Sequence, residues 1–340
     1  MTTINESLAG DFILVGFSDH PQLEKILFIL FAVVLISYLL TLVGNTAIIL
    51  ISYLDPMLHT PMYYFLTHLS FADLCLTTSI APQLLWNLRG PYKTISPTGC
   101  AIQLYVSLAL GSTECVLLAV MAFDRYAAVC RPLHYATVMH SRLCQSLVGM
   151  AWLSGVGNTL IQSTITLRLP RCGNRRIYHF ICEVPAMVKL ACVNIHANEV
   201  QLFMASLVLL LLPLTLILIS YGCIAQAVMR IRSAQAWRKA LALGTCGSHL
   251  LVVTLFYGTI TAVYIQPKSS YAHSQGKFIT LLYTVVTPTL NPLIYTLRNK
   301  DVKGALKKLV QKDRAHRDLT HQISNFQYII QENVGHDFPT

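Results

Sequence analysis

Residues 121–135, MAFDRYAAVCRPLHY, are the stretch from which the fold can be worked out. They place an acid and a base, Asp124 and Arg125, side by side at the end of a long apolar segment. An ionised Asp or Arg at the centre of a bilayer costs about 2.5 to 3.5 kcal/mol on insertion scales. We therefore expect this pair to lie at a membrane edge or to face other protein groups.

The composition is that of a membrane protein. The 340 residues are 54% hydrophobic and 12% charged, whereas soluble domains are about 25% charged. Seven segments approach or exceed the roughly 20 residues that a helix needs to cross about 30 Å of hydrocarbon. These predicted spans are 26–54, 62–88, 98–125, 143–167, 200–229, 240–267 and 278–297. The apolar runs are continuous, which favours helices over a barrel, so we predict an all-α membrane protein with a seven-transmembrane-helix bundle.

The distribution of basic residues sets the expected orientation. Seven spans put the two ends of the chain on opposite sides of the membrane, and with the C-terminus inside, 15 of the 25 Lys and Arg residues lie on the inner side. The positive-inside rule then predicts that residues 1–25 are extracellular. This segment does not show the pattern of a cleaved signal peptide, and its Asn-Glu-Ser triplet makes Asn5 a glycosylation candidate. We attribute the net charge of +10 to this topology, and we expect contact with membrane lipid and not with nucleic acid.

A short amphipathic helix is predicted after the seventh span, at residues 298–310. Apolar residues recur there at helical spacing opposite lysines, which suits a helix on the inner membrane surface. They are Val302, Ala305, Leu306, Leu309 and Val310. Residues 311–340 are polar and mixed in charge, and we expect a disordered cytoplasmic tail.

Besides Asp124 at the end of the third span, two acids fall within the predicted spans. Glu114 lies 14 residues after Cys100, so it is about 21 Å along its helix and near mid-depth. Asp73 lies at a similar depth in the preceding span, and Asn291 in the seventh is a candidate polar partner. Two bare carboxylates would repel each other, so a shared proton or a bound cation such as sodium is one interpretation. A purely structural hydrogen-bonded cluster is the other.

Four cysteines fall on the expected outer side: Cys100 at the start of the third span, and Cys172, Cys182 and Cys192 in the long loop before the fifth. Four cysteines allow three pairings, and their positions in the sequence do not choose among them.

An ordered set of motifs resembles one receptor family. The motifs are PMYYF at 61–65, MAFDRY through LHY at 121–135, SY at 220–221, TC and SHL within 245–250, and PTLNPLIY at 288–295. Together they resemble the vertebrate odorant receptors, which are rhodopsin-like G-protein-coupled receptors, and the match runs from about residue 16 to 309. The loop stretch HFICEVPA at 179–186 resembles the tetrapod-type group.

The resemblance implies a function and a location. A receptor of this kind binds a small, mostly hydrophobic volatile ligand within the bundle and activates a stimulatory heterotrimeric G protein, which raises cAMP. It is not an enzyme and needs no cofactor apart from the sodium ion considered above. We expect a multi-pass plasma-membrane protein with an extracellular N-terminus, located in the cilia of olfactory sensory neurons.

The resemblance also implies roles for particular residues. It pairs Cys100 with Cys182 and Cys172 with Cys192, and it makes Asp73, Glu114 and Asn291 the polar cluster inside the membrane. The expected activation switch consists of Asp124, Arg125, Tyr126, Tyr221, Asn291, Pro292 and Tyr295. One feature departs from the family pattern: Lys239 and Ala240 lie further from Thr245 than is usual, so the sixth helix is expected to start earlier or to be shifted.

The expected ligand pocket lies in the outer half of the bundle. On the third helix, one face repeats at helical spacing and carries Leu104, Ser107, Leu108, Gly111, Ser112 and Cys115. Pocket positions implied by the family are Ala205, Ser206, Leu209, Tyr257, Ile260, Thr261, Tyr264 and Thr284. Ordinary helix packing is the alternative role for each. An apolar lining with several hydroxyls favours a largely hydrocarbon ligand with one oxygen function. Since Ser107 stands where amine receptors carry an acid, we expect a poor response to amines.

Three other functions are weighed against this one. A membrane enzyme would need a clustered nucleophile and base or a metal site, and Cys246 and His249 share a helical face without a second ligand pair nearby in the sequence. A transporter would show inverted repeats or paired broken helices, and seven unequal spans offer neither. A rhodopsin-like receptor that works outside the nose on a non-odorant ligand would have the same sequence features.

Overall fold

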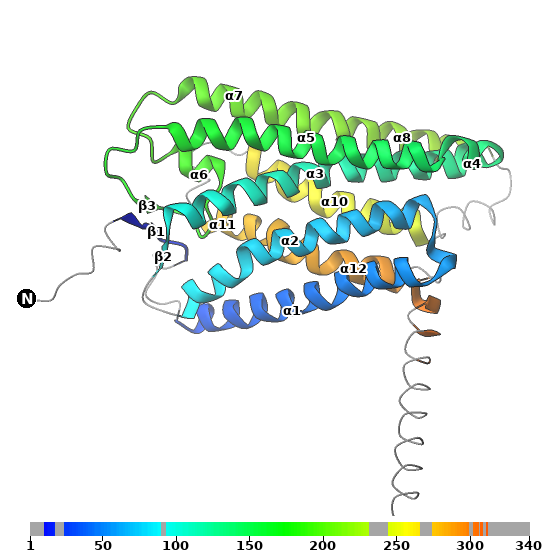
Figure 1. Cartoon of the computed structure of the whole chain (residues 1–340), viewed down its shortest axis with the longest axis horizontal. Helices are drawn as coiled ribbons and strands as arrows, with labels where there is room; N and C mark the ends of the chain where they lie inside the picture. The colour runs from blue at the N-terminus through cyan, green and yellow to red at the C-terminus, as the bar shows by residue number, and fades with distance from the viewer. Residues whose placement is uncertain are drawn as a thin grey trace, which may run out of the picture.

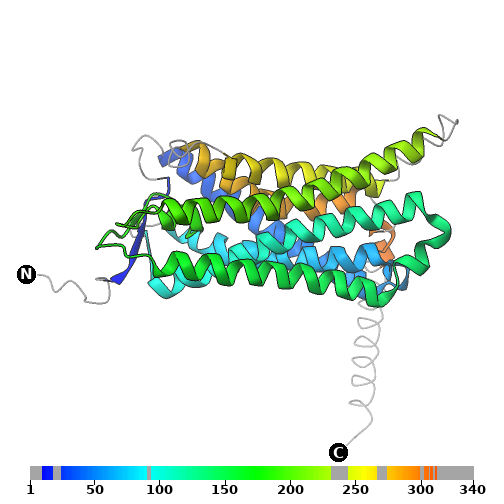
Figure 2. The same ribbon diagram turned by 90° about the horizontal axis from the view of Figure 1, so that it is seen from above.

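The described residues form one elongated bundle of helices. The computed structural model describes residues 10–17, 24–89, 93–230, 244–265, 274–298, 302–305, 307–308 and 311. Seven long helical segments in these ranges run side by side along the long axis (Figures 1 and 2). They are α1 (Glu24–Leu54), α2 (Pro61–Arg89), α3 (Pro97–Cys130), α5 (Ser141–Arg168), α7 with α8 (His196–Ser206 and Leu212–Met229), α10 (Gly244–Ile265), and α11 with α12 (Ser274–Leu281 and Thr287–Arg298). The prediction of an all-α seven-helix bundle is confirmed.

The bundle exposes apolar side chains on its outside. On α1, Phe28 is 74% and Val43 70% exposed, which carries little cost when the surrounding solvent is lipid. Among the described residues, four segments are long and apolar enough to cross a membrane by length and composition alone: Leu27–Leu54, Pro97–Cys130, His196–Met229 and Gly276–Thr296. The most apolar window of α3 is 61% buried against 17% for α1. Helix α3 is therefore a central element of the bundle and α1 a peripheral one.

A small sheet covers one end of the bundle, which we call the sheet end (Figure 1). Its strands are β1 (Phe12–Leu14), β2 (Thr94–Ile95) and β3 (Arg176–Ile177), in the order β2-β1-β3. Strand β1 is antiparallel to β2, with Phe12 opposite Ile95, and parallel to β3, with Leu14 opposite Ile177. A short helix, α6 (Val184–Val188), follows in the same loop region. The N-terminal segment, for which no structure was predicted, thus contributes the central strand.

The opposite end, which we call the Arg125 end, consists of short turns between helices. They are the 3-10 turns Pro56–Leu58 and Pro132–His134 and the short helix α4 (Tyr135–Val138). Helix α3 continues to Cys130, five residues beyond the predicted end of the third span. It stops there because Pro132 disfavours helical backbone at the preceding residue. Arg125 accordingly lies one turn inside the helix and not at its end.

Two glycines allow close approach between helices. A Cβ on Gly155 of α5 would lie 2.2 Å from Thr113 Oγ1 and 2.5 Å from the Ala109 carbonyl oxygen of α3. A Cβ on Gly44 of α1 would lie 2.7 Å from Pro292 Cγ of α12. Small residues at such contacts let membrane helices pack tightly by van der Waals contact.

Residues after the seventh helical segment fold back against the bundle. Residues 302–305 and 307–308 are helical, and Val302 and Ala305 are buried in the core. Lys308 Nζ lies 3.4 Å from Asp55 Oδ2 in the first turn of the Arg125 end. Leu306, Leu309 and Val310 of the predicted amphipathic helix lie outside the described residues, as do most of the predicted tail and Asn5.

Candidate functional site

A cavity lies between the helices toward the sheet end, with about 840 Å³ of empty space, its open side included. Residues of α2, α3, α5, α7 and α10 contribute to it, together with the start of α6, the loop before it, and the π-helical turns Leu207–Leu211 and Leu282–Val286. Its lining residues are Leu76, Leu104, Ser107, Leu108, Gly111, Ser112, Cys115, Asn158, Gln162, Ile181, Glu183, Val184, Leu202, Ala205, Ser206, Leu209, Leu210, Phe256, Ile260, Tyr283 and Thr284. The lining is mostly apolar, so a ligand held here would be stabilised chiefly by burial of its own apolar surface.

The structure brings most of the predicted pocket residues together around this cavity. The third-helix face does so because residues at i, i+3, i+4, i+7 and i+8 share one side of a helix. The predicted residues that line the cavity are Leu104, Ser107, Leu108, Gly111, Ser112, Cys115, Ala205, Ser206, Leu209, Ile260 and Thr284.

Three predicted pocket residues on α10 do not belong to this lining. Phe256 and Ile260 turn toward the cavity, and Tyr257 is rotated from Phe256 by about 100°, the helical angle per residue. Tyr257 instead faces α3, where its hydroxyl donates to the Cys115 carbonyl oxygen at 2.8 Å. Thr261 is half-buried and lines no part of the cavity. The side chain of Tyr264 lies outside the described residues.

Sequence reasoning missed the contributions of α5 and of the loop before α6. Asn158 and Gln162 are four residues apart on one face of α5, and Asn158 Nδ2 donates to Ser112 Oγ at 3.1 Å. Ile181 and Glu183 reach the cavity from the loop, and Val184 does so from the start of α6. The usable signal was the position of Cys182 within this loop, since a bridge from it to α3 would bring its neighbours over the pocket. The other lining residues missed were Leu76, Leu202, Leu210, Phe256 and Tyr283.

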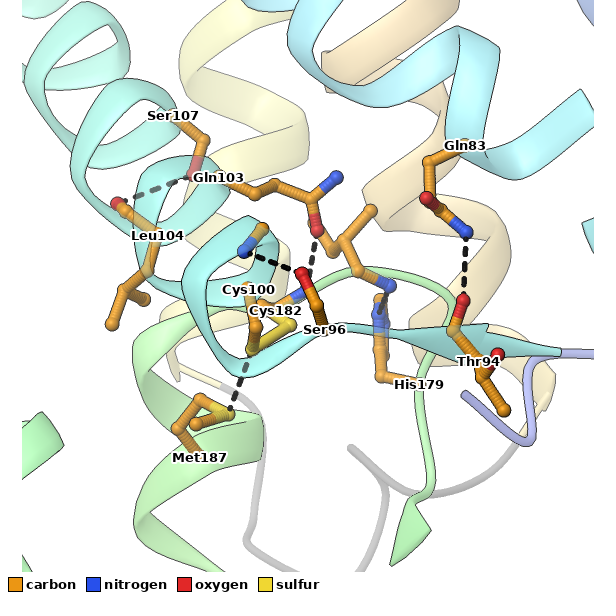
Figure 3. Close-up of a disulfide and its surroundings, with 12 residues drawn as sticks. Gln83, Thr94, Ser96, Cys100, Gln103, Leu104, Ser107, His179, Cys182 and Met187 are labelled. Atoms are coloured by element: carbon orange, nitrogen blue, oxygen red, sulfur yellow. Dashed lines mark hydrogen bonds between the residues drawn. A yellow bond between two sulfur atoms is a disulfide. The ribbon is translucent and has the colours of Figure 1, made fainter. Parts of the chain in front are cut away.

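Covalent and hydrogen bonds fix that loop to the start of α3. A disulfide joins Cys100 to Cys182, and the Cys182 N–H donates to Gln103 Oε1 at 2.8 Å (Figure 3). The Gln103 amide also donates to the Ser79 carbonyl oxygen of α2 at 2.9 Å. A second disulfide joins Cys172 to Cys192 within the loop. These are the two pairings that the resemblance implied.

Glu183 lies at this end of the cavity and contacts two side chains. Tyr283 Oη donates to Glu183 Oε2 at 3.0 Å, and His179 Nε2 lies 3.3 Å from Glu183 Oε1. Burial raises the pKa of Glu183 to about 8, although the Tyr283 hydrogen bond and Lys189 act in the opposite direction. Burial lowers the pKa of His179 to about 3, and Lys277 and Lys189 add to this effect. Near neutral pH the contact therefore joins a neutral imidazole to a largely protonated carboxyl group and is not an ion pair.

Two π-helical turns interrupt the helices beside the cavity, at Leu207–Leu211 and Leu282–Val286. Leu209, Leu210, Tyr283 and Thr284, which line the cavity, lie within them. A π turn inserts one residue into the helical register, and such turns occur frequently at functional sites.

At the Arg125 end, the buried carboxylate of Asp124 is held by two neighbours. Arg125 donates to Asp124 Oδ2 from Nε at 3.0 Å and also from its terminal nitrogen. Tyr135 Oη donates to Asp124 Oδ1 at 2.7 Å. The ring of Tyr126 contacts that of Phe123. The predicted acid–base pair is thus formed within one helix turn and is tied to α4.

Further predicted switch residues lie between this end and the cavity. Tyr221 Oη hydrogen-bonds to His249 Nδ1 at 2.9 Å, and His249 Nε2 to the Leu118 carbonyl oxygen at 3.1 Å. These contacts join α8, α10 and α3. Tyr295 is buried, and Pro292 lies inside α12. The start of the sixth helical segment around Lys239 lies outside the described residues.

The predicted polar cluster is present in the middle of the bundle. Asn291 Nδ2 donates to Asp73 Oδ2 at 2.9 Å, and Glu114 is buried close enough to Asp73 to interact with it electrostatically. One oxygen of each of these three residues is buried without a hydrogen-bond partner among the described residues. Oxygens of this kind fit a proton shared between the acids or a hard cation. In the described part of the chain, His, Cys, Asp and Glu form no group of three or more that could hold a metal ion.

Comparison with known proteins gives a single family. A family model described as olfactory receptor matches residues 33–313. Human olfactory receptor 2G3 is 63% identical over 306 residues, covering 90% of this chain and 97% of its own. Human olfactory receptor 2G2 is 61% identical over 308 residues, with 91% and 96% covered. Mouse olfactory receptor 2C1 is 59% identical over 314 residues, with 92% and 99% covered.

Proposed function

Because the chain belongs to the olfactory receptor family, we propose that it binds a small, mostly hydrophobic volatile ligand in the cavity and thereby activates a stimulatory heterotrimeric G protein, raising cAMP. It is an odorant receptor of the G-protein-coupled class and not an enzyme. The olfactory-type form of that G protein is the proposed partner.

The observation that carries the proposal is the placement of cavity and switch on one helix. Leu104, Gly111 and Cys115 of α3 line the cavity, and Asp124 and Arg125 lie on the same helix beyond them. The lining offers apolar surface and a few hydroxyl and amide groups. This combination suits a hydrocarbon ligand with one oxygen function.

The proposed mechanism is a shift between two arrangements of the bundle. A ligand changes such an equilibrium only by its different affinity for the two states. The cavity is lined by α8-side residues such as Leu209 and by Phe256 of α10, and the Tyr221–His249–Leu118 contacts join those helices to α3. Repacking at the cavity would thus loosen these contacts. The helices would bend at Pro213, in the first turn of α8, and at Pro292, inside α12. Opening of the Asp124–Arg125 pair would then expose a groove for a G-protein helix.

We further propose a plasma-membrane location with the sheet end outside. The two disulfides at that end fit an oxidising compartment, and Asn5 is the proposed glycosylation site. Tyr126, Asn291 and Tyr295 complete the proposed activation switch. The helical residues around Val302 would contact lipid of the inner leaflet. Olfactory sensory cilia are the proposed cellular site. Asp73, Glu114 and Asn291 would hold a sodium ion or a shared proton, or serve as a structural hydrogen-bonded cluster.

The test uses cells that express the full chain with a stimulatory G protein. Volatile alcohols, aldehydes, ketones, esters and acids are applied, and cAMP is measured. Arg125→Ala should abolish the response at equal surface expression because it removes half of the buried pair. The matched control is Arg131→Ala, since Arg131 is exposed at the same end of α3. A ligand response that survives Arg125→Ala undiminished would contradict the assignment of the switch.

A further inference from the structure

Glu183 brings a carboxyl group into the cavity from a loop that the predicted pocket did not include. It is 5% exposed, and it follows Cys182, whose disulfide and hydrogen bond to Gln103 fix the backbone at this point. Among the described residues that line the cavity, it is the only one with a carboxyl group, and none of the others is a Lys, Arg or His. Ser107 shows only that α3 lacks an acid at its position, whereas Glu183 comes from the loop.

The hydrogen bonds around Glu183 define which groups face it. The Ile181 N–H donates to His179 Nδ1 at 3.4 Å, so Nδ1 is the acceptor and the neutral ring carries its hydrogen on Nε2. His179 Nε2 lies 3.3 Å from Glu183 Oε1, and Tyr283 Oη donates to Oε2. A protonated carboxyl group can accept at both oxygens and still has an O–H to donate.

Charged groups near the carboxyl favour a neutral ligand over a cation. Lys189 interacts electrostatically with Glu183 and with Glu199. Lys277 is buried, donates to the Gly16 carbonyl oxygen, and interacts with His179. Two lysines at this end of the cavity oppose the approach of an ammonium group. The proton that burial retains on Glu183 at neutral pH has the same effect, because a neutral acid cannot pair with a cation.

We propose that Glu183 is the specificity-determining residue of the pocket and that its carboxyl O–H donates a hydrogen bond to the carbonyl oxygen of an aldehyde, ketone or ester. The inference rests on the proposed function, because it assigns a ligand class to the same cavity. The hydrocarbon part of the ligand packs against apolar lining residues such as Leu108, Leu209 and Ile260. Amines of equal length bind less well.

The pH dependence of binding provides a signature that a merely structural role would not produce. The protonated form binds the carbonyl, so affinity is full below the pKa of about 8 and falls above it. Between about pH 7 and pH 9 the apparent Kd should rise about tenfold. Glu183→Gln has no proton to lose and should show no such slope. Tyr283→Phe removes a hydrogen bond that lowers the pKa of Glu183, so it should move the midpoint to higher pH.

Binding is measured on the purified full chain in lipid nanodiscs, without a G protein. Thermal stabilisation by heptanal, heptan-2-one and ethyl pentanoate is compared with that by heptylamine and by heptane. Glu183→Leu should weaken the best carbonyl compound about tenfold, the value of one hydrogen bond to a buried group, and leave heptane unchanged. The matched control is Glu199→Leu, which removes an acid near Lys189 that does not line the cavity. Surface labelling in cells confirms that each variant folds.

Each result has a definite meaning. A carbonyl preference that depends on Glu183 and on pH supports the inference. If the same receptor fails to raise cAMP, only the proposed coupling to the stimulatory G protein is wrong. Three results would overturn the inference. Heptylamine could stabilise the receptor more than the carbonyl compounds do, no carbonyl compound could stabilise it, or Glu183→Leu could bind the carbonyl compounds as tightly as the wild type. A cAMP response that is independent of Glu183 would leave the proposed function intact and remove only this assignment.

Discussion

The sheet end and the Arg125 end of the bundle are held by different kinds of contact. At the sheet end, the Cys100–Cys182 disulfide, a three-stranded sheet and the Gln103 hydrogen bonds join segments that are far apart in the sequence, and a second disulfide lies within the loop. At the Arg125 end, and between it and the cavity, side chains such as Tyr135, Tyr221 and His249 join the described helices to one another. Covalent and backbone bonds keep one geometry, whereas side-chain contacts exchange partners at small cost.

This difference suggests a division of labour along α3. The end that contains the cavity keeps its shape, so that Glu183 and the α3 face stay in register for a ligand. The other end is joined by contacts that a moderate change in free energy can break. Three sets of variants test the division, in order of decreasing expected effect.

The largest effect is expected from removing the bridge at the sheet end. The double variant Cys100→Ser and Cys182→Ser should lose about 2–4 kcal/mol of stability and most of its surface expression. The matched control is Cys130→Ser with Cys223→Ser, two half-buried free cysteines on α3 and α8, which should express normally. Expression and thermal unfolding are measured for both. Equal losses in the two double variants would remove the proposed difference between the ends.

An intermediate effect is expected where α5 packs against α3, the frame that both ends share. Gly155→Ala would place a Cβ 2.5 Å from the Ala109 carbonyl oxygen, so the helices must separate, at a cost of about 1–3 kcal/mol. Gly149→Ala on the same helix is the control, since a Cβ there meets nothing within 4 Å, and it should be neutral or slightly stabilising. Thermal unfolding of the purified receptor distinguishes them. Equal unfolding temperatures would show that this contact is not part of a rigid frame.

The sequence predicted the parts of the molecule that depend on local periodicity. The helical segments and the α3 face from Leu104 to Cys115 follow from the helical repeat and from continuous apolar runs. Strand β1 was not predicted. A strand of three residues, Phe12–Leu14, is too short to show an alternating pattern, and its partners lie near residues 94 and 176.

The candidate site shows the same limit. Glu183 lies over the cavity because a disulfide holds its neighbour there, and Tyr257 faces α3 because the register of α10 turns Phe256 inward. Both depend on contacts between distant segments. Motif positions fixed which residues belong to the outer half of the bundle, but not which of them turn toward the ligand.

The smallest effect, and the most specific one, is expected from single hydroxyl groups that join α3 to different neighbours. Tyr257 Oη donates to the Cys115 carbonyl oxygen and links α3 to α10, while Tyr105 Oη and Thr164 Oγ1, 2.7 Å apart, link α3 to α5. Each Tyr→Phe change removes one hydrogen bond, about 1 kcal/mol. If α10 moves on activation and α5 does not, Tyr257→Phe should raise basal cAMP up to about fivefold.

Tyr105→Phe should lower the unfolding temperature about as much as Tyr257→Phe does. It should leave basal cAMP unchanged, because the Tyr105–Thr164 hydrogen bond is the same in the inactive and the active state. Basal cAMP is normalised to the amount of receptor at the cell surface. An equal rise in both variants would mean that α5 also moves, and no rise in either would mean that the α3–α10 contact survives activation. Both hydrogen bonds involve α3 and differ only in the partner helix, α10 for Tyr257 and α5 for Tyr105. Either result would therefore mean that the boundary between the fixed and the mobile helices does not lie between α5 and α10.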